Sequence, residues 1–370
     1  MIINHEKKLK FYFMKKIREK DYLISVLEDN KKYLVSGTYR VSWTGKRKVY
    51  LKNKNTAHFL LKNKLQSNNS FLFKMKSVID AISASLSTIT ITNEKEQKLE
   101  GELVMMTYSS NVKIIDFTKK IILNRMEAAP LTYERVKQGY QSLNKHFKMT
   151  IIEFLDEEFI YYEKYLEFIP YNLWEARDIK DCINEIFNSY IRYFVTIKKG
   201  DIPTHNPAAL FEEIKATDYK NHKTIIAVEE WLEESPEELL YPIIRGHGDM
   251  KFENILLAEK EFYFIDLEFS AAYFFIYDLI NLIFNEAMNG DFSYVQAFLE
   301  GAYDEKYKKL FEAMGLEYDN KKKLYYIAVY LVDRIIHYDL KVVVHRLDLT
   351  DMFNKYFMIM TKIEELDKQV

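Results

Sequence analysis

The stretch 247-HGDMKFENILL-257, followed closely by 262-FYFIDLEFS-270, decides the fold of this chain. Asp249 and Asn254 stand five positions apart in the first stretch, and Asp266 ends the apolar run of the second. A phosphoryl-transfer site needs a carboxylate that orients or deprotonates an alcohol, and oxygen ligands that hold Mg²⁺ on a triphosphate. These three side chains meet both needs, so the two stretches predict a phosphoryl-transfer site.

The arrangement resembles the catalytic signature of the kinase superfamily, in particular the branch of aminoglycoside phosphotransferases and choline kinases. In that signature, His-x-Asp with an Asn five residues beyond the Asp precedes a strand that ends in Ile-Asp. His247, Asp249 and Asn254 match the first motif, and Asp266 with the Ile before it matches the metal motif. The sequence 277-YDLINLIFNE-286 resembles the Asp-led helix that follows in choline kinases, although its Glu sits one position off. The resemblance covers about residues 100 to 300.

The resemblance implies ATP and Mg²⁺ as cofactors and gives each residue of the signature a role. Asp249 is the expected base, and Lys251 stands where its ammonium would neutralise charge on the transferred phosphoryl group. Asn254 and Asp266 are the expected metal ligands. His247 is either a structural residue that bonds backbone near Asp266 or a proton-transfer group.

Two further acidic residues have candidate roles in this region. Glu268 is either a second metal ligand or a solvated residue. Asp278, which opens the helix after the metal motif, is expected to support the catalytic segment through backbone contacts.

The nucleotide-binding candidates precede this region. The segment 107-TYSSN-111 resembles the nucleotide loop of these kinases, and 121-IILNRM-126 resembles a third strand that ends in a basic residue. The candidates that follow are Ser109, Ser110, Asn111, Arg125 and, in the next helix, Glu134. An open alternative replaces Arg125 by Lys113, Lys119 or Lys120.

The hydrophobic periodicity predicts a two-lobed α+β protein, in which a small antiparallel β lobe precedes a mainly helical large lobe. The resemblance implies that this arrangement is a protein-kinase-like fold. We expect a basic N-terminal accessory region over 1–98, the small lobe over 99–170 and the large lobe with the catalytic loop over 171–370. Within these parts, the pattern predicts a hairpin in 33–52, a strand in 87–92, a three-stranded meander in 102–126, a helix in 133–147, strands in 150–155 and 158–166, a β island in 254–269, and a packed core helix over 325–338.

Charge is distributed unevenly along the chain. The 370 residues carry a formal charge of −2, but residues 1–76 hold 19 Lys or Arg against 5 Asp or Glu. This region either binds a polyanion or an anionic membrane face or forms a lysine-coated surface, and it carries no specific nucleic-acid motif. The single cysteine, Cys182, and the lack of a signal-peptide pattern favour the cytoplasm.

The expected activity is ATP-dependent phosphorylation of a hydroxyl group on a small molecule, such as a sugar, an amino alcohol, an aminoglycoside-like compound or a cell-envelope precursor. One alternative is a catalytically silent kinase-like scaffold. A protein kinase is disfavoured because Gly-x-Gly-x-x-Gly, Asp-Phe-Gly and Ala-Pro-Glu are missing from the sequence, although Lys251 keeps this alternative open.

Overall fold

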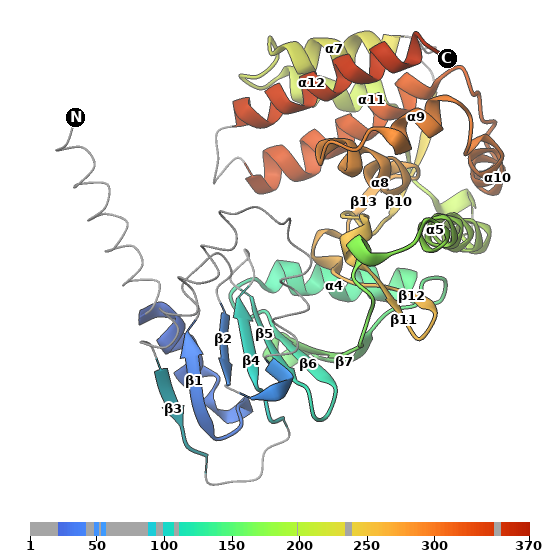
Figure 1. Cartoon of the computed structure of the whole chain (residues 1–370). Helices are drawn as coiled ribbons and strands as arrows, with labels where there is room; N and C mark the ends of the chain where they lie inside the picture. Colours follow the sequence, from blue (N-terminus) through green and yellow to red (C-terminus); the bar gives the residue numbers. More distant parts are fainter. Residues whose placement is uncertain are drawn as a thin grey trace. The chain divides into compact units, whose positions relative to one another are not determined.

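The computed structural model divides the chain into two compact units, and each is described by itself (Figure 1). Unit 1 comprises Met1–Glu134 and Thr150–Asn172, and unit 2 comprises Arg135–Met149 and Leu173–Val370. The structure describes residues 21–41, 48–51, 53–56, 88–93, 99–106, 111–197, 199–233, 239–343 and 349–370.

Unit 1 is built on one eight-stranded sheet, in which every neighbouring pair of strands is antiparallel. The strands follow the order β3-β1-β2-β4-β5-β6-β8-β7 across the sheet. Their bounds are β1 Gly37–Val41, β2 Lys48–Leu51, β3 Thr88–Ile91, β4 Leu103–Met106, β5 Val112–Asp116, β6 Ile121–Arg125, β7 Ile151–Leu155 and β8 Ile160–Lys164. The predicted hairpin, the 102–126 meander and the later strands are confirmed, because β-branched and aromatic residues alternate between the two faces.

One face of this sheet carries the core of unit 1. A helix over residues 21–29 packs its apolar side against that face, together with the segment that leads to β1. The buried cluster includes Leu23, Val26, Leu27, Leu34, Tyr39, Val41, Val49, Ile91, Val104, Val112, Ile114 and Leu123.

The expected separation of residues 1–98 from the small lobe needs correction for the described strands. β1, β2 and β3 precede residue 98 and β4 follows it, yet β2 pairs directly with β4 in one sheet. Their side chains also share the buried cluster. Backbone hydrogen bonds and a common core therefore join these strands to the rest of unit 1.

Helix α4 (Pro130–Leu143) begins three residues before the helix predicted over 133–147 and ends earlier. Pro130 suits the first helical position, because its missing N–H would be unpaired there in any case. Tyr133 is buried near the start of α4 and donates a hydrogen bond to Asp156 at 2.7 Å.

Unit 2 is mainly helical, as predicted. Its helices are α5 Ala176–Thr196, α6 Pro207–Lys215, α7 Lys223–Glu233, α8 Tyr277–Met288, α9 Ser293–Leu299, α10 Asp304–Met314, α11 Lys323–Asp333, the π-helix Arg334–Val343 and α12 Leu349–Asp367. Every residue of α11 from Tyr325 to Asp333 is buried, which confirms the core helix expected there.

Two small sheets interrupt the helices of unit 2. The first has the order β13-β10-β9, with β9 Thr204–His205, β10 Tyr241–Arg245 and β13 Ala272–Phe274. The second is the hairpin of β11 Ile255–Ala258 and β12 Glu261–Phe264, which confirms the β island expected in 254–269. An antiparallel β unit and a mainly helical unit together confirm the predicted α+β class. Among the described residues, no helix has both the length and the apolar character to cross a bilayer.

Candidate functional site

The catalytic segment begins at the end of strand β10. Gly246, His247 and Gly248 follow Arg245, the last residue of the strand, and lead to Asp249. The Gly246 N–H donates to the carbonyl of Ala271 at 2.9 Å, so the pairing between β10 and β13 continues into the segment. A buried strand thus fixes the start of the catalytic segment.

The carboxylate of Asp278 supports the catalytic segment by binding backbone N–H groups of that segment. This carboxylate accepts the N–H of His247 at 2.7 Å and the N–H of Gly248 at 2.9 Å. Tyr190 of α5 donates its hydroxyl hydrogen to the same carboxylate. Burial raises the pKa of Asp278, while these hydrogen bonds oppose that rise. The predicted backbone support by Asp278 is therefore present.

His247 connects the catalytic segment to the metal motif. The ring is 1% exposed, and its Nε2 lies 2.8 Å from the carbonyl oxygen of Ile265. The N–H of Asp249 donates to Nδ1 at 3.3 Å, so Nε2 carries the ring hydrogen and donates it to that carbonyl. These contacts match the structural role expected for His247 and join the residue before Asp266 to the segment that carries Asp249.

Gly248 is required by the path of the backbone. It has φ +83°, and a Cβ at this position would lie 2.1 Å from the carbonyl oxygen of Phe269. A Cβ at Gly246 would lie 2.5 Å from the Asp278 carboxylate. Both glycines therefore permit a close approach that no larger residue allows without movement.

Asp249 is held by two side chains of its own segment. Lys251 Nζ donates to Asp249 Oδ2 at 2.7 Å, and Asn254 Nδ2 donates to the same oxygen at 2.9 Å. Asn254 Nδ2 also lies 2.8 Å from the Asp249 carbonyl oxygen. The structure brings together three of the candidate residues, Asp249, Lys251 and Asn254, and their hydrogen bonds fix the direction of the Asp249 carboxylate.

The segment alternates between anchored and accessible side chains. Met250 and Phe252 are fully buried, whereas the side chains of Asp249 and Lys251 are 14% and 29% exposed. Burial disfavours the Lys251 ammonium, but the charge of Asp249 and its hydrogen bond outweigh burial and raise the pKa of Lys251. Lys251 therefore stays charged at neutral pH.

The β11–β12 hairpin brings the two expected metal ligands to the same end. Ile255 pairs with Phe264, and the Ile265 N–H donates to the Asn254 carbonyl at 3.0 Å. Asp266 follows in a left-handed conformation with φ 69°, which ends the strand and starts the turn 267–269. Glu268 lies in that turn and is 9% exposed.

The donor set suits Mg²⁺ better than a metal that needs an all-protein cage. No group of three or more His, Cys, Asp and Glu able to hold a metal occurs in the described part of the chain. An amide oxygen of Asn254 and the carboxylate of Asp266 are the hard oxygen ligands that Mg²⁺ accepts, with phosphate and water completing its shell. The residues present fit the expected ion.

The nucleotide candidates of unit 1 have different surroundings. Ser109 and Ser110 lie outside the described residues, and Asn111 is buried just before β5. Arg125 ends β6 and bonds Glu127 at 2.6 Å and Asn30 at 3.0 Å.

Glu134, the last nucleotide candidate, is exposed on α4. Arg125 forms an ion pair with Glu127, and this contact engages its guanidinium within unit 1.

Three side chains that support the candidate site were not predicted from the sequence. Asn281 of α8 donates to the Met250 carbonyl at 2.9 Å and accepts the hydroxyl of Tyr330 at 2.9 Å. Ser270 is fully buried and donates to the Gly246 carbonyl at 2.7 Å. A signal existed for Asn281, because it follows Asp278 by three positions in the mainly apolar first part of α8, and that spacing places both on one face. Tyr190 had none, since α5 is distant in sequence.

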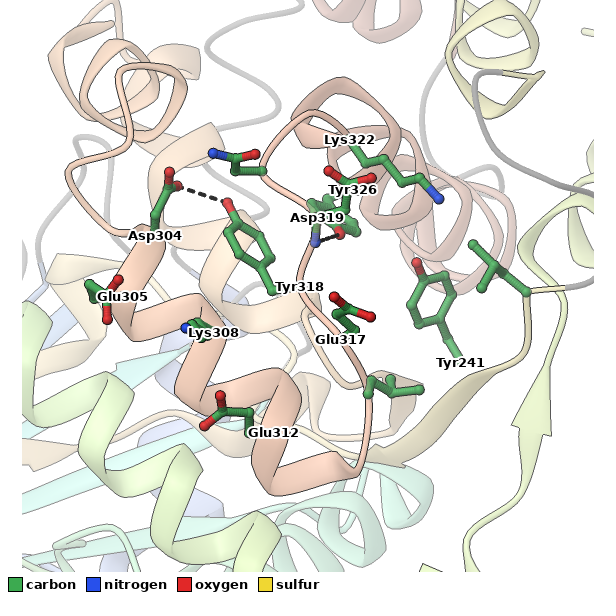
Figure 2. Close-up of a pocket in the computed structure, with 13 residues that line it drawn as sticks. Tyr241, Asp304, Glu305, Lys308, Glu312, Glu317, Tyr318, Asp319, Lys322 and Tyr326 are labelled. Carbon is green, nitrogen blue, oxygen red and sulfur yellow. Dashed lines mark hydrogen bonds between the residues drawn. The ribbon is translucent and has the colours of Figure 1, made fainter.

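Figure 2 shows a pocket of about 790 Å³ in another part of unit 2. Tyr318 donates to Asp304 at 2.9 Å, and the Asp319 N–H donates to the hydroxyl of Tyr326 at 3.1 Å on its wall. The pocket includes Tyr241, the first residue of β10, whereas the catalytic segment follows the last residue of that strand. It is therefore separate from the Asp249 site.

Comparison with known families gives one match along the sequence. Residues 200–310 match the phosphotransferase enzyme family. The matched region contains the catalytic segment, the β11–β12 hairpin and α8. A comparison with curated proteins finds no match to this chain.

Several solved structures have a similar chain path. A choline kinase from Streptococcus pneumoniae is 16% identical, with a TM-score of 0.42 over 79% of this chain and 99% of the other. An ethanolamine kinase from Plasmodium vivax is 16% identical, with a TM-score of 0.41 over 86% of this chain and 92% of the other. An aminoglycoside phosphotransferase from Streptomyces rimosus is 14% identical, with a TM-score of 0.37 over 61% of this chain and 91% of the other.

The family match falls on the residues that the signature selected. Asp249, Asn254 and Asp266 lie inside the matched range, as does the supporting Asp278. The match over residues 200–310 covers the part of the chain that carries the signature, and it agrees with the predicted resemblance of this part to phosphotransferases.

Proposed function

We propose that the protein transfers the γ-phosphoryl group of ATP to a hydroxyl group of a small molecule. The observation that carries this proposal is the fixed carboxylate of Asp249, whose Oδ2 accepts hydrogen bonds from both Lys251 and Asn254. The two bonds direct Oδ1 toward an acceptor, while the hairpin holds Asp266 at the same end of the site. This is the arrangement that an in-line displacement at phosphorus needs.

Asp249 orients the acceptor hydroxyl and takes its proton as the oxygen attacks the γ-phosphorus. The bond between that phosphorus and the bridging oxygen breaks, and ADP leaves with the electron pair. Lys251 places a positive charge beside the reacting group and stabilises the negative charge on the equatorial oxygens. The ion pair at 2.7 Å keeps this ammonium in position before substrate binds.

Asn254 and Asp266 would hold Mg²⁺, which neutralises triphosphate charge when it is bound. Glu268 remains a proposed additional ligand. In unit 1, Ser109, Ser110, Asn111 and Glu134 remain proposed nucleotide contacts.

The proposed acceptor is a small alcohol: a sugar, an amino alcohol, an aminoglycoside-like compound or a cell-envelope precursor. The family match over residues 200–310 supports a phosphotransferase, and the acceptor class is part of our proposal. Measuring ADP formation by purified protein against a panel of these four acceptor groups identifies which one is used. Hydrolysis that no member of the panel accelerates would contradict the proposed class.

Asp249→Asn tests the base directly. The variant keeps the size of the side chain but removes the proton acceptor, so we expect kcat to fall by about 10² to 10⁴ while ATP affinity stays within a few-fold. Glu253→Gln is the matched control, because Glu253 is an exposed carboxylate of the same segment. Wild-type turnover in Asp249→Asn would overturn the mechanism.

Asp266→Ala tests the metal ligand. Removing this carboxylate leaves triphosphate charge uncompensated, so calorimetry should show loss of the Mg²⁺-dependent part of ATP affinity. Unchanged Mg²⁺ dependence would remove Asp266 from this role. Nucleotide binding by the wild-type protein without turnover on any acceptor would instead indicate a silent kinase-like scaffold.

A further inference from the structure

The two faces of the sheet in unit 1 differ in chemistry. The face described above carries the apolar cluster, including Val112, Ile114 and Leu123. Side chains alternate along each strand, so Lys113 and Asn124 lie on the opposite face. The strand register joins the members of that face into one row across the sheet: Lys48, Met105, Lys113, Asn124, Tyr161 and Phe154.

Arg125 does not belong to this row. It follows Asn124 by one position, so it shares the face of Leu123 and the apolar cluster. Its guanidinium donates to the side-chain oxygen of Asn30 at 3.0 Å and to the carbonyl of Asp29 at 3.3 Å, both next to the helix over 21–29. Arg125, the basic residue selected from the sequence pattern, therefore forms its contacts on the side of the sheet that carries the apolar cluster.

Asn124, the residue before Arg125, lies on the opposite face of the sheet, but its amide side chain carries no charge. It is fully buried, and its Nδ2 donates to Glu163 Oε2 at 2.8 Å. Thr150 donates to the second oxygen of Glu163 at 3.2 Å. An amide cannot offset phosphate charge, so a cation is needed from a neighbouring position.

Lys113 is the neighbouring cation. It pairs directly with Asn124 across β5 and β6, and directly paired residues of an antiparallel sheet have Cβ atoms about 5 Å apart. Lys48 lies on β2, three strands from β6, at roughly 14 Å from the position of Asn124 by the usual spacing of about 4.8 Å. A lysine side chain spans about 5 Å but not roughly 14 Å, so Lys113 reaches the position of Asn124 and Lys48 does not.

The position of Lys113 along β5 also favours it as the phosphate-binding cation. Lys113 is the second residue of β5, and this strand begins directly after the segment 107–111 that resembles a nucleotide loop. Lys119, by contrast, lies in the turn at the other end of the β5–β6 hairpin. We propose that Lys113, and not Arg125, supplies the cation of unit 1 that binds the phosphates of the nucleotide.

This inference rests on the proposed function, because it assumes that the chain binds ATP. The test titrates wild-type protein, Lys113→Ala and Lys119→Ala with ATP and, separately, with adenosine in a calorimeter. Lys119→Ala removes the same charge from an exposed position of the same hairpin and is the matched control. We expect Lys113→Ala to weaken ATP binding by about 10- to 100-fold and to leave adenosine binding unchanged, because an ammonium contacts the phosphates alone.

A double variant that moves the positive charge to a neighbouring position distinguishes loss of the cation from a folding defect. Adding Asn124→Lys to Lys113→Ala returns a cation to the same row, one strand away and beside Glu163. Recovery of at least part of the ATP affinity in this double variant supports the proposal.

Three results overturn the inference. Equal ATP affinity in wild type and Lys113→Ala refutes it while the proposed function stands. A loss in Arg125→Ala without a loss in Lys113→Ala returns the role to Arg125. A wild-type protein that binds no ATP refutes the proposed function and this inference with it.

Discussion

Replacing Asp278 by Asn isolates the support of the catalytic segment. The carboxylate accepts the backbone N–H groups of His247 and Gly248 with separate oxygens and also accepts the hydroxyl of Tyr190. Asn offers one acceptor oxygen and one NH₂ group in the same volume. If the oxygen stays on Gly248, the NH₂ group faces the N–H of His247, and two donors meet in the protein interior.

The magnitude follows from these contacts. Asp278 Oδ2 accepts both the His247 N–H and the Tyr190 hydroxyl, so both bonds to this charged oxygen are lost. The hydroxyl can turn and accept from the new NH₂ group, so the net loss is about one hydrogen bond to a charged group, roughly 1.5–3 kcal/mol, and the His247 N–H is left unpaired. Burial raises the pKa of Asp278, so removing its charge recovers part of this cost. We expect a net loss of about 2 kcal/mol in the free energy of unfolding, which is roughly a 30-fold change in the unfolding equilibrium.

Urea unfolding and turnover assays measure the effect together. Tyr190→Phe is the matched comparison, because it removes one donor to Asp278 and leaves both backbone bonds, at a cost of about 1 kcal/mol. In Asp278→Asn, turnover should fall more than ATP affinity, since the supported segment carries Asp249. An Asp278→Asn protein with wild-type stability and wild-type turnover would refute the reasoning.

Three further outcomes are expected. Gly248→Ala should lower both the melting temperature and the turnover, because its Cβ would meet the Phe269 carbonyl at 2.1 Å; wild-type behaviour in thermal unfolding would contradict that geometry. Burial raises the pKa of Asp339 to about 7, so the folded state binds a proton that the unfolded state has lost, and stability should fall by up to about 1.4 kcal/mol per pH unit between pH 4 and 7; the slope should shrink in Asp339→Asn. Deleting residues 1–98 should unfold unit 1, because three strands and the helix over 21–29 leave the sheet; a folded truncation by circular dichroism would restore the separate accessory region. Retention of the full chain on anionic vesicles that weakens with salt would support the predicted polyanion surface, and no retention at low salt would favour the lysine-coated alternative.

The candidate catalytic residues could be selected from the sequence because they are close together along the chain. Asp249, Lys251 and Asn254 interact within six residues, and the short hairpin that follows brings Asp266 to the same end. Local spacing and alternating apolar residues encode such an arrangement directly.

The contacts that support the site were not readable, because they join distant segments. Tyr190 reaches Asp278 across 88 positions, and nothing in the pattern of α5 marks it. Asn281 was visible as a polar residue in an apolar helix, but its partner, the Met250 carbonyl, appears only when α8 packs under the segment.

Residue types and short periodicities in the sequence were sufficient to select the candidate site residues, the class of fold and the order of the elements. Tertiary structure alone decided which face of a strand each cation occupies and which strands share a sheet. Arg125 and Asn124 are neighbours in the chain, yet the pleat sends them to opposite faces, and the pairing of β2 with β4 joins the first hundred residues to unit 1. Register and long-range pairing are set by the packing of the whole sheet, and a shift of one residue reverses every face, which is why no local pattern could fix them.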